Sequence, residues 1–123
     1  MGARKNSLPG LFGLGVDLVE VSRIRALARR NPAFLKRFFT AGELAYSLKG
    51  KNKFERLAAR FAVKEAVIKA LDATHLALKD IEVENTASGR PHVTVKKLPS
   101  AALLVSISHT ARHAMAAAVA FKK

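Results

Sequence analysis

The segment from residue 54 to residue 72 limits how this chain can fold more than any other part of the sequence. It contains neither glycine nor proline, and its apolar side chains recur at every third or fourth position. This spacing predicts one long α-helix. Beyond it the period changes from helical to alternating, which is typical of strands.

The alternating part of the sequence predicts four strands. Two short ones, at 81–85 and 92–95, flank the turn Ser88-Gly-Arg-Pro91, and a final antiparallel pair is expected at 103–108 and 115–121. Helices come first and strands gather later, which favours an α+β fold with N-terminal helices packed on a small, mainly antiparallel sheet. Because no repeat or long linker interrupts the chain, residues 1–123 are expected to form a single domain.

The N-terminal half is predicted to begin with a short strand at 13–18. Asp17-Leu-Val-Glu20 has the spacing of a capping box, so Asp17 is expected to cap a helix that Asn31-Pro32 ends. A short helix is expected at 33–39, and a second box, Thr40-Ala-Gly-Glu43, predicts another near 44–48. The core-facing residues of the first helix are then Val21, Ile24, Leu27 and Ala28.

The chain is strongly basic. It has 22 Lys and Arg against 9 Asp and Glu, a formal net charge of +13. Between Arg23 and Arg60, eleven basic residues stand against only Glu43 and Glu55. Such a region attracts a polyanion: nucleic acid, an anionic membrane, a phosphate-rich small molecule or an acidic protein. The alternative is an ordinary solvated helix face.

Cysteine is absent, which excludes disulfides, thiolate nucleophiles and cysteine zinc sites and is compatible with a reducing compartment. No apolar run approaches the roughly 18 residues of a membrane span. The stretch at 8–21 would resemble a signal peptide, but it is interrupted by Pro9, three glycines and Asp17. We therefore expect a cytoplasmic protein that does not associate with membranes.

One carboxylate stands out in the long helix. On a helical wheel Glu65 falls at the middle of the apolar arc, and Lys64 and Lys69 fall nearer its edges. A buried carboxylate is costly unless it is paired or bound to a cation. An ion pair between Glu65 and Lys69, four residues apart, is the ordinary explanation.

Asp17 and Glu65 together suggest a metal site. They lie 48 residues apart, one at a strand-to-helix junction and the other on a helix face. Mg²⁺ takes few protein ligands and fills its shell with water and substrate phosphates. Two carboxylates with Lys69 nearby therefore fit a magnesium–phosphate site, whereas for Asp17 alone a helix cap is the simpler reading.

Other chemistries have less support. Ser106-Ile-Ser-His109 contains no catalytic triad or nucleophile elbow. The glycines before the first helix match no complete phosphate-binding loop. A zinc site would have to draw on the chain's four histidines, two of which are expected to flank a hairpin turn. These are His75, His92, His109 and His113.

Four segments resemble a known family in order and spacing. The resemblance is to the holo-[acyl-carrier-protein] synthases, the small cytosolic branch of the 4′-phosphopantetheinyl transferases. It covers nearly the whole chain beyond an N-terminal extension at residues 1–9, for which we have no functional interpretation. The segments are Gly13-Leu-Gly-Val-Asp17-Leu-Val-Glu20, Arg60-Phe-Ala-Val-Lys64-Glu65-Ala-Val-Ile-Lys69-Ala70, Gly89-Arg-Pro91 and Val105-Ser-Ile-Ser-His109-Thr110.

The resemblance implies a reaction in which the 4′-phosphopantetheine arm of coenzyme A moves to a serine of apo acyl carrier protein and adenosine 3′,5′-bisphosphate is released. It implies Mg²⁺ as cofactor, coenzyme A as co-substrate and a place in fatty acid biosynthesis. It also implies an α+β fold and a homotrimer with active sites between protomers.

The catalytic positions of the family map onto three residues. Asp17 and Glu65 match its magnesium-binding carboxylates, and Lys69 matches a lysine that contacts the pyrophosphate region. The carrier serine needs a general base, and Glu65 and a water on the metal both remain candidates.

The binding positions of the family map onto a second set. His109 matches a histidine near the coenzyme A phosphates, with Thr110 beside it. The loop Gly89-Arg90-Pro91 matches one that lines the nucleotide pocket. Arg23 and Arg30 match basic positions that dock the acidic recognition helix of the carrier protein.

The chain departs from the family in one place. Relatives continue the Lys-Ala segment with one or two glycines, whereas Leu71-Asp72-Ala73-Thr74 has none, so the phosphate contacts near Asp72 are in question. Two rival functions are a non-enzymatic nucleic-acid-binding module and a magnesium-dependent nuclease. The first leaves Asp17 and Glu65 unexplained, and the phenylalanines fall at core positions rather than in a base-stacking stripe.

Overall fold

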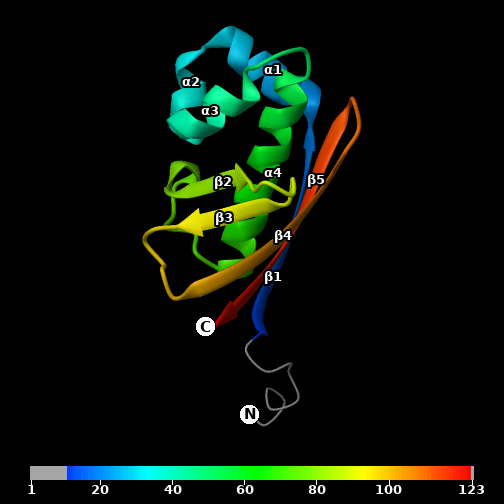
Figure 1. Cartoon of the computed structure of the whole chain (residues 1–123). Helices are drawn as coiled ribbons and strands as arrows, with labels where there is room; N and C mark the ends of the chain where they lie inside the picture. Colours follow the sequence, from blue (N-terminus) through cyan, green and yellow to red (C-terminus); the bar gives the residue numbers. More distant parts are fainter. Residues whose placement is uncertain (1–10, 123) are drawn as a thin grey trace.

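The computed structural model describes residues 11–122, so the N-terminal extension at residues 1–9 lies outside the described part. Helices occupy the first half and antiparallel strands dominate the second, which confirms the predicted α+β fold (Figure 1). The elements are β1 (Leu11–Glu20), α1 (Val21–Arg30), α2 (Ala33–Phe38), α3 (Ala41–Ser47), α4 (Lys53–Leu71), the 3-10 turn η2 (Leu78–Asp80), β2 (Ile81–Asn85), β3 (Pro91–Val95), β4 (Ala101–His109) and β5 (His113–Lys122).

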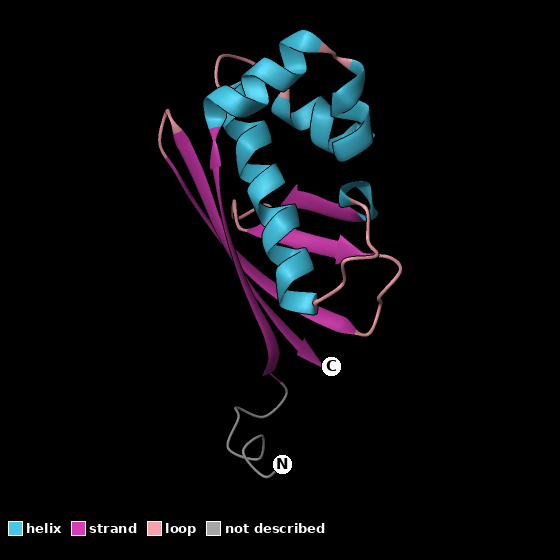
Figure 2. Cartoon of the chain, turned by 180° about the vertical axis from the view of Figure 1, so that it is seen from behind, coloured by secondary structure: helices cyan, strands magenta, loops and turns pink. Residues whose placement is uncertain are grey.

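Two sheets surround the long helix. β1, β5 and β4 form a three-stranded antiparallel sheet with β5 in the centre, while β2 and β3 form a separate antiparallel pair. Helix α4 packs along the larger sheet (Figure 2), and α1, α3 and β2 pack against its other sides. The final antiparallel pair expected from the sequence is β4–β5. That β1 joins it as the third strand was not predicted.

Small residues allow α4 to lie directly on the sheet. A Cβ atom added at Gly13 would come within 1.6 Å of the Ala70 carbonyl oxygen, and one at Gly15 within 2.0 Å of the Ala66 carbonyl oxygen. The glycines therefore serve helix–strand contact rather than phosphate binding. Under the same helix, β5 presents four buried alanines at alternate positions, namely Ala114, Ala116, Ala118 and Ala120.

The prediction that Asp17 caps the first helix is wrong. β1 continues through Asp17 to Glu20, because β5 pairs with it as far as Glu20 opposite His113. The N-cap position of α1 is Glu20, whose side chain makes no capping hydrogen bond. Asp17 is therefore a strand residue, and an explanation of its carboxylate as a helix cap no longer applies.

The second predicted capping box is confirmed. The Thr40 hydroxyl accepts a hydrogen bond from the Glu43 backbone N–H, and the Glu43 carboxylate accepts one from the Thr40 backbone N–H. The long helix spans Lys53–Leu71, one residue earlier at each end than predicted. Among the described helices, none is long and apolar enough to cross a bilayer.

Candidate active site

Asp17 and Lys69 meet where β1 crosses α4. The strand and the helix run in opposite directions, since Gly13 lies under Ala70 and Gly15 under Ala66. Asp17, two residues further along β1, therefore lies beside the middle of the helix. The Lys69 Nζ is 3.3 Å from the Asp17 Oδ1 and donates a hydrogen bond to the Val16 carbonyl oxygen at 2.9 Å.

Glu65 occupies the same side of α4, one turn before Lys69. Its side chain is partly exposed, and within residues 11–122 it forms neither a hydrogen bond nor an ion pair. The expected Glu65–Lys69 ion pair is absent from the described part of the chain because Lys69 pairs with Asp17 instead. Glu65 thus presents a carboxylate without a protein partner beside an acid and a lysine.

The helical wheel misplaced the buried charge. Lys64 is fully buried and Glu65 is not, the reverse of the prediction. The wheel assumed that one side of the helix faces solvent, but α4 is enclosed by the sheet on one side and by α3 and β2 on another. The free carboxylate lies along a flank of the helix that remains accessible.

The donor set on this flank fits a hard divalent cation. Two carboxylates and no softer ligand are the chemistry that Mg²⁺ prefers, and Mg²⁺ takes only one or two carboxylates from a protein. In the described part of the chain no group of three or more acidic, histidine or cysteine side chains forms a fuller metal cage. Asp17 and Glu65 would be the ligands.

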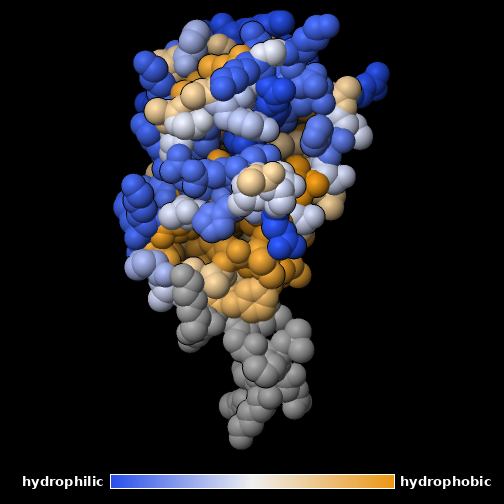
Figure 3. Space-filling model, in the orientation of Figure 1, coloured by the Kyte–Doolittle hydropathy of each residue, from blue (hydrophilic) through white to orange (hydrophobic). Residues whose placement is uncertain are grey.

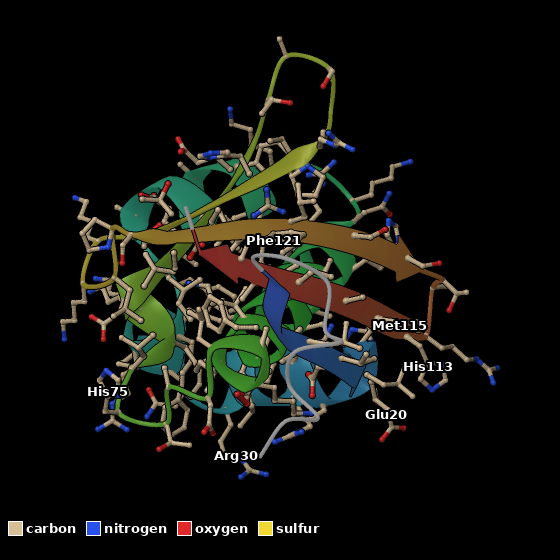
Figure 4. The ribbon with its side chains drawn as sticks, turned by 90° about the horizontal axis from the view of Figure 1, so that it is seen from below. Glu20, Arg30, His75, His113, Met115 and Phe121 are labelled. Atoms are coloured by element: carbon tan, nitrogen blue, oxygen red, sulfur yellow. The ribbon has the colours of Figure 1, made fainter. Side chains whose placement is uncertain are left out.

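The histidines do not gather into a zinc site. His109 ends β4 and His113 begins β5, so the two flank a hairpin turn as predicted. His75 lies on the opposite side of the molecule from His113 (Figure 4).

A cavity of about 640 Å³ lies on another flank of α4. It is bounded by the end of α3, the first half of α4, the β2–β3 turn and strand β4. The predicted residues Gly89, Arg90, Pro91 and His109 all line it. Sequence reasoning missed the others: Tyr46, Asn52, Glu55, Arg56, Ala59, Arg60, Asn85, Val105, Ser106 and Ile107.

Arg60 is the most constrained cation of this cavity. Only 4% of the residue is exposed, and its guanidinium lies 4.3 Å from the centre of the Tyr46 ring. Its Nη2 donates to the Asn85 Oδ1 at 2.8 Å, whereas its Nε has no partner among the described residues. Burial lowers the pKa of the Arg60 guanidinium, but an arginine remains charged at neutral pH.

His109 and Thr110 have different surroundings. The His109 Nδ1 lies 3.5 Å from the Glu55 Oε1 at the cavity wall. Thr110 is in the β4–β5 turn, where its hydroxyl accepts hydrogen bonds from the Arg112 and His113 backbone N–H groups. His109 therefore faces the cavity, and Thr110 holds the turn behind it.

The two groups of predicted residues lie on opposite flanks of α4. Asp17 is on the edge strand β1 and His109 on the opposite edge strand β4, with β5 and the overlying helix between them. Glu65 and Arg60 are five residues apart, which turns their side chains about 140° from each other around the helix. One chain thus presents the carboxylates and the cavity in different directions.

Two surface features complete the description. Arg23 and Arg30 are exposed on α1, seven residues apart and hence on one side of it; Figure 4 shows Arg30 pointing outward. Hydrophilic side chains cover the helical end of the molecule, and hydrophobic ones gather at the opposite end (Figure 3). On the sheet face away from α4, the exposed apolar residues include Leu14, Val16, Leu18, Leu104 and Met115.

Asp72 is the C-cap residue of α4, in the segment where the family resemblance leads us to expect glycine. Its backbone has φ 52° and ψ 42°, the left-handed conformation in which glycine is favoured after a helix. Aspartate adopts this conformation more readily than most residues with a side chain. The helix end is therefore built without the glycine, at the cost of a carboxylate three residues from Lys69.

Comparisons with known sequences identify the family of this chain. The sequence model of the 4′-phosphopantetheinyl transferase superfamily matches residues 13–120. Among curated relatives, the holo-[acyl-carrier-protein] synthases of Thermodesulfovibrio yellowstonii and Bacillus subtilis are 46% and 40% identical, over 85% and 89% of this chain and 93% and 94% of theirs.

Solved structures give the same result. The crystal structure of a holo-(acyl-carrier-protein) synthase from Bacillus anthracis, in complex with CoA (3′,5′-ADP), has a TM-score of 0.82 at 30% identity, covering 93% of this chain and 99% of that one. The Helicobacter pylori enzyme in complex with coenzyme A has a TM-score of 0.77 at 31% identity, covering 87% and 98%. This chain therefore belongs to the 4′-phosphopantetheinyl transferase superfamily.

Proposed function

We propose that this chain transfers the 4′-phosphopantetheine group of coenzyme A to a serine of apo acyl carrier protein, depends on Mg²⁺ and releases adenosine 3′,5′-bisphosphate. The observation that carries the proposal is the placement of Asp17, Glu65 and Lys69 on one flank of α4. Lys69 pairs with Asp17 there, and Glu65 lies one helical turn before Lys69, so this flank offers carboxylates and a cation of the kind that phosphoryl-transfer sites use. We also expect the reaction to serve fatty acid biosynthesis in the cytoplasm, as the family resemblance implies.

The cavity is the proposed site of the nucleotide half of coenzyme A. Its volume falls within the range of small-molecule sites, and it combines the Tyr46 ring with the cations Arg56, Arg60 and Arg90. Guanidinium groups bind phosphate with directed, charge-assisted hydrogen bonds. The Bacillus anthracis and Helicobacter pylori relatives were both solved with coenzyme A, which supports this assignment.

The bond-breaking step is placed at the flank of α4 that carries Asp17, Glu65 and Lys69, called here the carboxylate flank. A magnesium ion held by Asp17 and Glu65 would neutralise charge on the pyrophosphate. The exposed Lys69 ammonium stabilises the same charge and orients the phosphate. The serine oxygen forms a bond to the β-phosphorus as the bond to the bridging oxygen breaks, and the bisphosphate leaves. Glu65, which forms no ion pair within residues 11–122, accepts the serine proton.

We further propose that each active site is shared between two copies in a homotrimer. One coenzyme A has to reach both the carboxylates and the cavity, but a single chain directs them to opposite flanks of α4. Leu14 and Leu18 are 67% and 65% exposed on the open face of the sheet. Exposed apolar patches of this kind mark protein interfaces, so this face is the proposed contact between copies.

The transfer is tested with coenzyme A, Mg²⁺ and apo carrier protein. We expect mass spectrometry to detect a carrier serine that has gained the phosphopantetheine mass, and no gain when Mg²⁺ is chelated. A competent carrier that gains no mass would refute the proposal. A gain that persists without divalent metal would refute only the magnesium site.

The shared site has its own test. Glu65→Gln and Arg60→Met variants each lose one half of the site, so neither is expected to transfer well alone. If sites are shared, random mixing of the two by unfolding and refolding restores roughly a quarter of the wild-type sites. No recovery in mixed trimers would place each site within one chain. Sedimentation measures the assembly, and we expect Leu18→Glu to lower its mass.

A further inference from the structure

The Glu43 carboxylate joins three elements of the fold inside the protein. Glu43 is 1% exposed. Its Oε1 accepts from the Thr40 N–H at 2.8 Å and lies 2.6 Å from the Lys64 Nζ, while its Oε2 accepts from the Val83 N–H at 2.7 Å. One side chain on α3 thus holds both α4 and β2.

Lys64 completes this buried junction. Besides Glu43, its ammonium donates to the carbonyl oxygens of Leu78 at 3.0 Å and Ile81 at 2.7 Å. All three ammonium protons therefore have acceptors. Burial lowers the pKa of Lys64, and the Glu43 carboxylate opposes that effect. With no exposed surface and no free proton, Lys64 has nothing to offer a substrate.

Each element that Glu43 holds also carries a residue of the cavity. Tyr46 follows Glu43 by three residues on α3, Arg60 precedes Lys64 by four on α4, and Asn85 follows Val83 by two on β2. Arg60 contacts both of the others: the Tyr46 ring at 4.3 Å and the Asn85 Oδ1 at 2.8 Å. The carboxylate of Glu43 and the guanidinium of Arg60 thus join the same three elements, one turn apart.

We propose that Glu43 is a positioning residue for coenzyme A binding, one that acts through Lys64 and Val83 to hold the Arg60 guanidinium at its place in the cavity. This inference rests on the proposed function, because it takes the cavity as the nucleotide site. A buried ion pair is by itself weak evidence for stability, since well-packed apolar residues are often equally stable. What apolar residues lack is the fixed direction of the contacts that Glu43 makes to α4 and β2.

The test is a double-mutant cycle on coenzyme A affinity, measured by calorimetric titration. Glu43→Gln keeps the size of the side chain and removes its charge. We expect it to weaken coenzyme A binding about tenfold while kcat at saturating coenzyme A stays within about threefold. In an Arg60→Met background the same change should have almost no further effect, because the group that it positions is gone. Glu84→Gln, an exposed change of the same charge on β2, is the matched control and should leave the affinity unchanged.

Several results would contradict the proposed role of Glu43. Normal coenzyme A affinity in folded Glu43→Gln, or equal losses in both backgrounds, would show that Glu43 has only a structural role. Normal affinity in Arg60→Met would refute the nucleotide assignment of the cavity, and this inference with it. If Glu43→Gln does not fold, the Glu43→Leu/Lys64→Met pair replaces the charges by apolar groups. A folded double variant with wild-type affinity would then overturn the proposal.

Discussion

Helix α4 carries two lysines that each pair with a carboxylate, and the two pairs have opposite surroundings. Lys69 lies 3.3 Å from Asp17, with side chains 56% and 18% exposed. Lys64 lies 2.6 Å from Glu43, and neither side chain is exposed. The lysines are five residues apart on the same helix, so the difference comes from what surrounds each pair.

The comparison separates structural charges from chemical ones. Glu43 and Lys64 are saturated with protein partners, so any substrate would have to break contacts made in the absence of water. Asp17 and Lys69 keep free hydrogen-bonding capacity and meet solvent, and Glu65, one helical turn before Lys69, has no partner among the described residues. A pair of this second kind can exchange its partner for a metal or a phosphate at little cost. For these two pairs, saturation with protein partners marks a structural role, and free hydrogen-bonding capacity marks a chemical one.

The largest expected effect is on the exposed flank. Glu65→Gln should reduce phosphopantetheine transfer by about 10³-fold or more, because it removes a metal ligand and a proton acceptor together. The melting temperature should stay close to that of the wild type, since Glu65 forms no ion pair to lose. The transfer assay and a thermal melt on the same preparation check both halves. A variant with a near-normal rate would make Glu65 a structural residue.

Removing one lysine from each pair sharpens the comparison. Lys64→Met leaves the buried Glu43 carboxylate without its lysine partner and should lower the free energy of unfolding by about 3–5 kcal/mol. Lys69→Met should cost less than about 1 kcal/mol, since the Lys69 side chain is 56% exposed and Asp17 still meets solvent. Activity should follow the reverse order: Lys69→Met folds normally but transfers poorly. Urea denaturation and the transfer assay measure the two quantities, and equal destabilisation by both variants would break the distinction.

A smaller effect is expected at the basic surface. Arg23→Glu should weaken the apparent affinity for an acidic carrier protein by about tenfold and increasingly so at low salt, because exposed charges act mainly through steering. Coenzyme A affinity should be unchanged. Titrations with each substrate distinguish the two. Lys96→Glu, the same charge reversal on an exposed residue after β3, is the control, and an equal loss there would show that net charge alone matters.

The sequence predicted the elements better than their surroundings. Periodicity located α4 and the later strands within a few residues, because those patterns are local. The state of Lys64 was not predictable in this way, since it depends on α3 and β2 closing over a side of the helix that a wheel treats as solvent. Arg60 was missed for the same reason. Two cations four residues apart, Arg60 and Lys64, inside an otherwise apolar run were the available signal.

The candidate site shows the same difference between local sequence pattern and tertiary packing. Asp17, Glu65 and Lys69 came from local sequence patterns and the family resemblance, and Asp17 contacts Lys69, whereas Tyr46 and Asn85 belong to no motif. The cavity is assembled from α3, α4, the β2–β3 turn and β4, so its composition depends on tertiary packing. Asp17 was expected to be a helix cap, but it is a strand residue. Its place beside α4 comes from the small residues Gly13 and Gly15, which let strand and helix touch.

The smallest effect is expected at a third carboxylate–lysine pair, Asp80 and Lys97. The Asp80 carboxylate accepts from the Ala77 backbone N–H at 2.9 Å and from the Lys97 Nζ at 3.1 Å, and the Lys97 side chain is 63% exposed. The Ala77 hydrogen bond, followed by Lys97, lowers the pKa of Asp80. A carboxylate whose pKa is lower in the folded state stabilises the fold at pH values above the ordinary aspartate pKa, and this stabilisation is lost as the pH falls through the folded pKa.

Asp80→Asn should therefore lower the melting temperature slightly at neutral pH and match the wild type in acid. Transfer should be unchanged at either pH, because this pair faces neither the carboxylate flank nor the cavity. Unchanged transfer would show that exposure alone does not make a pair reactive and that the position on α4 does, whereas a loss of transfer without a loss of stability would contradict this conclusion.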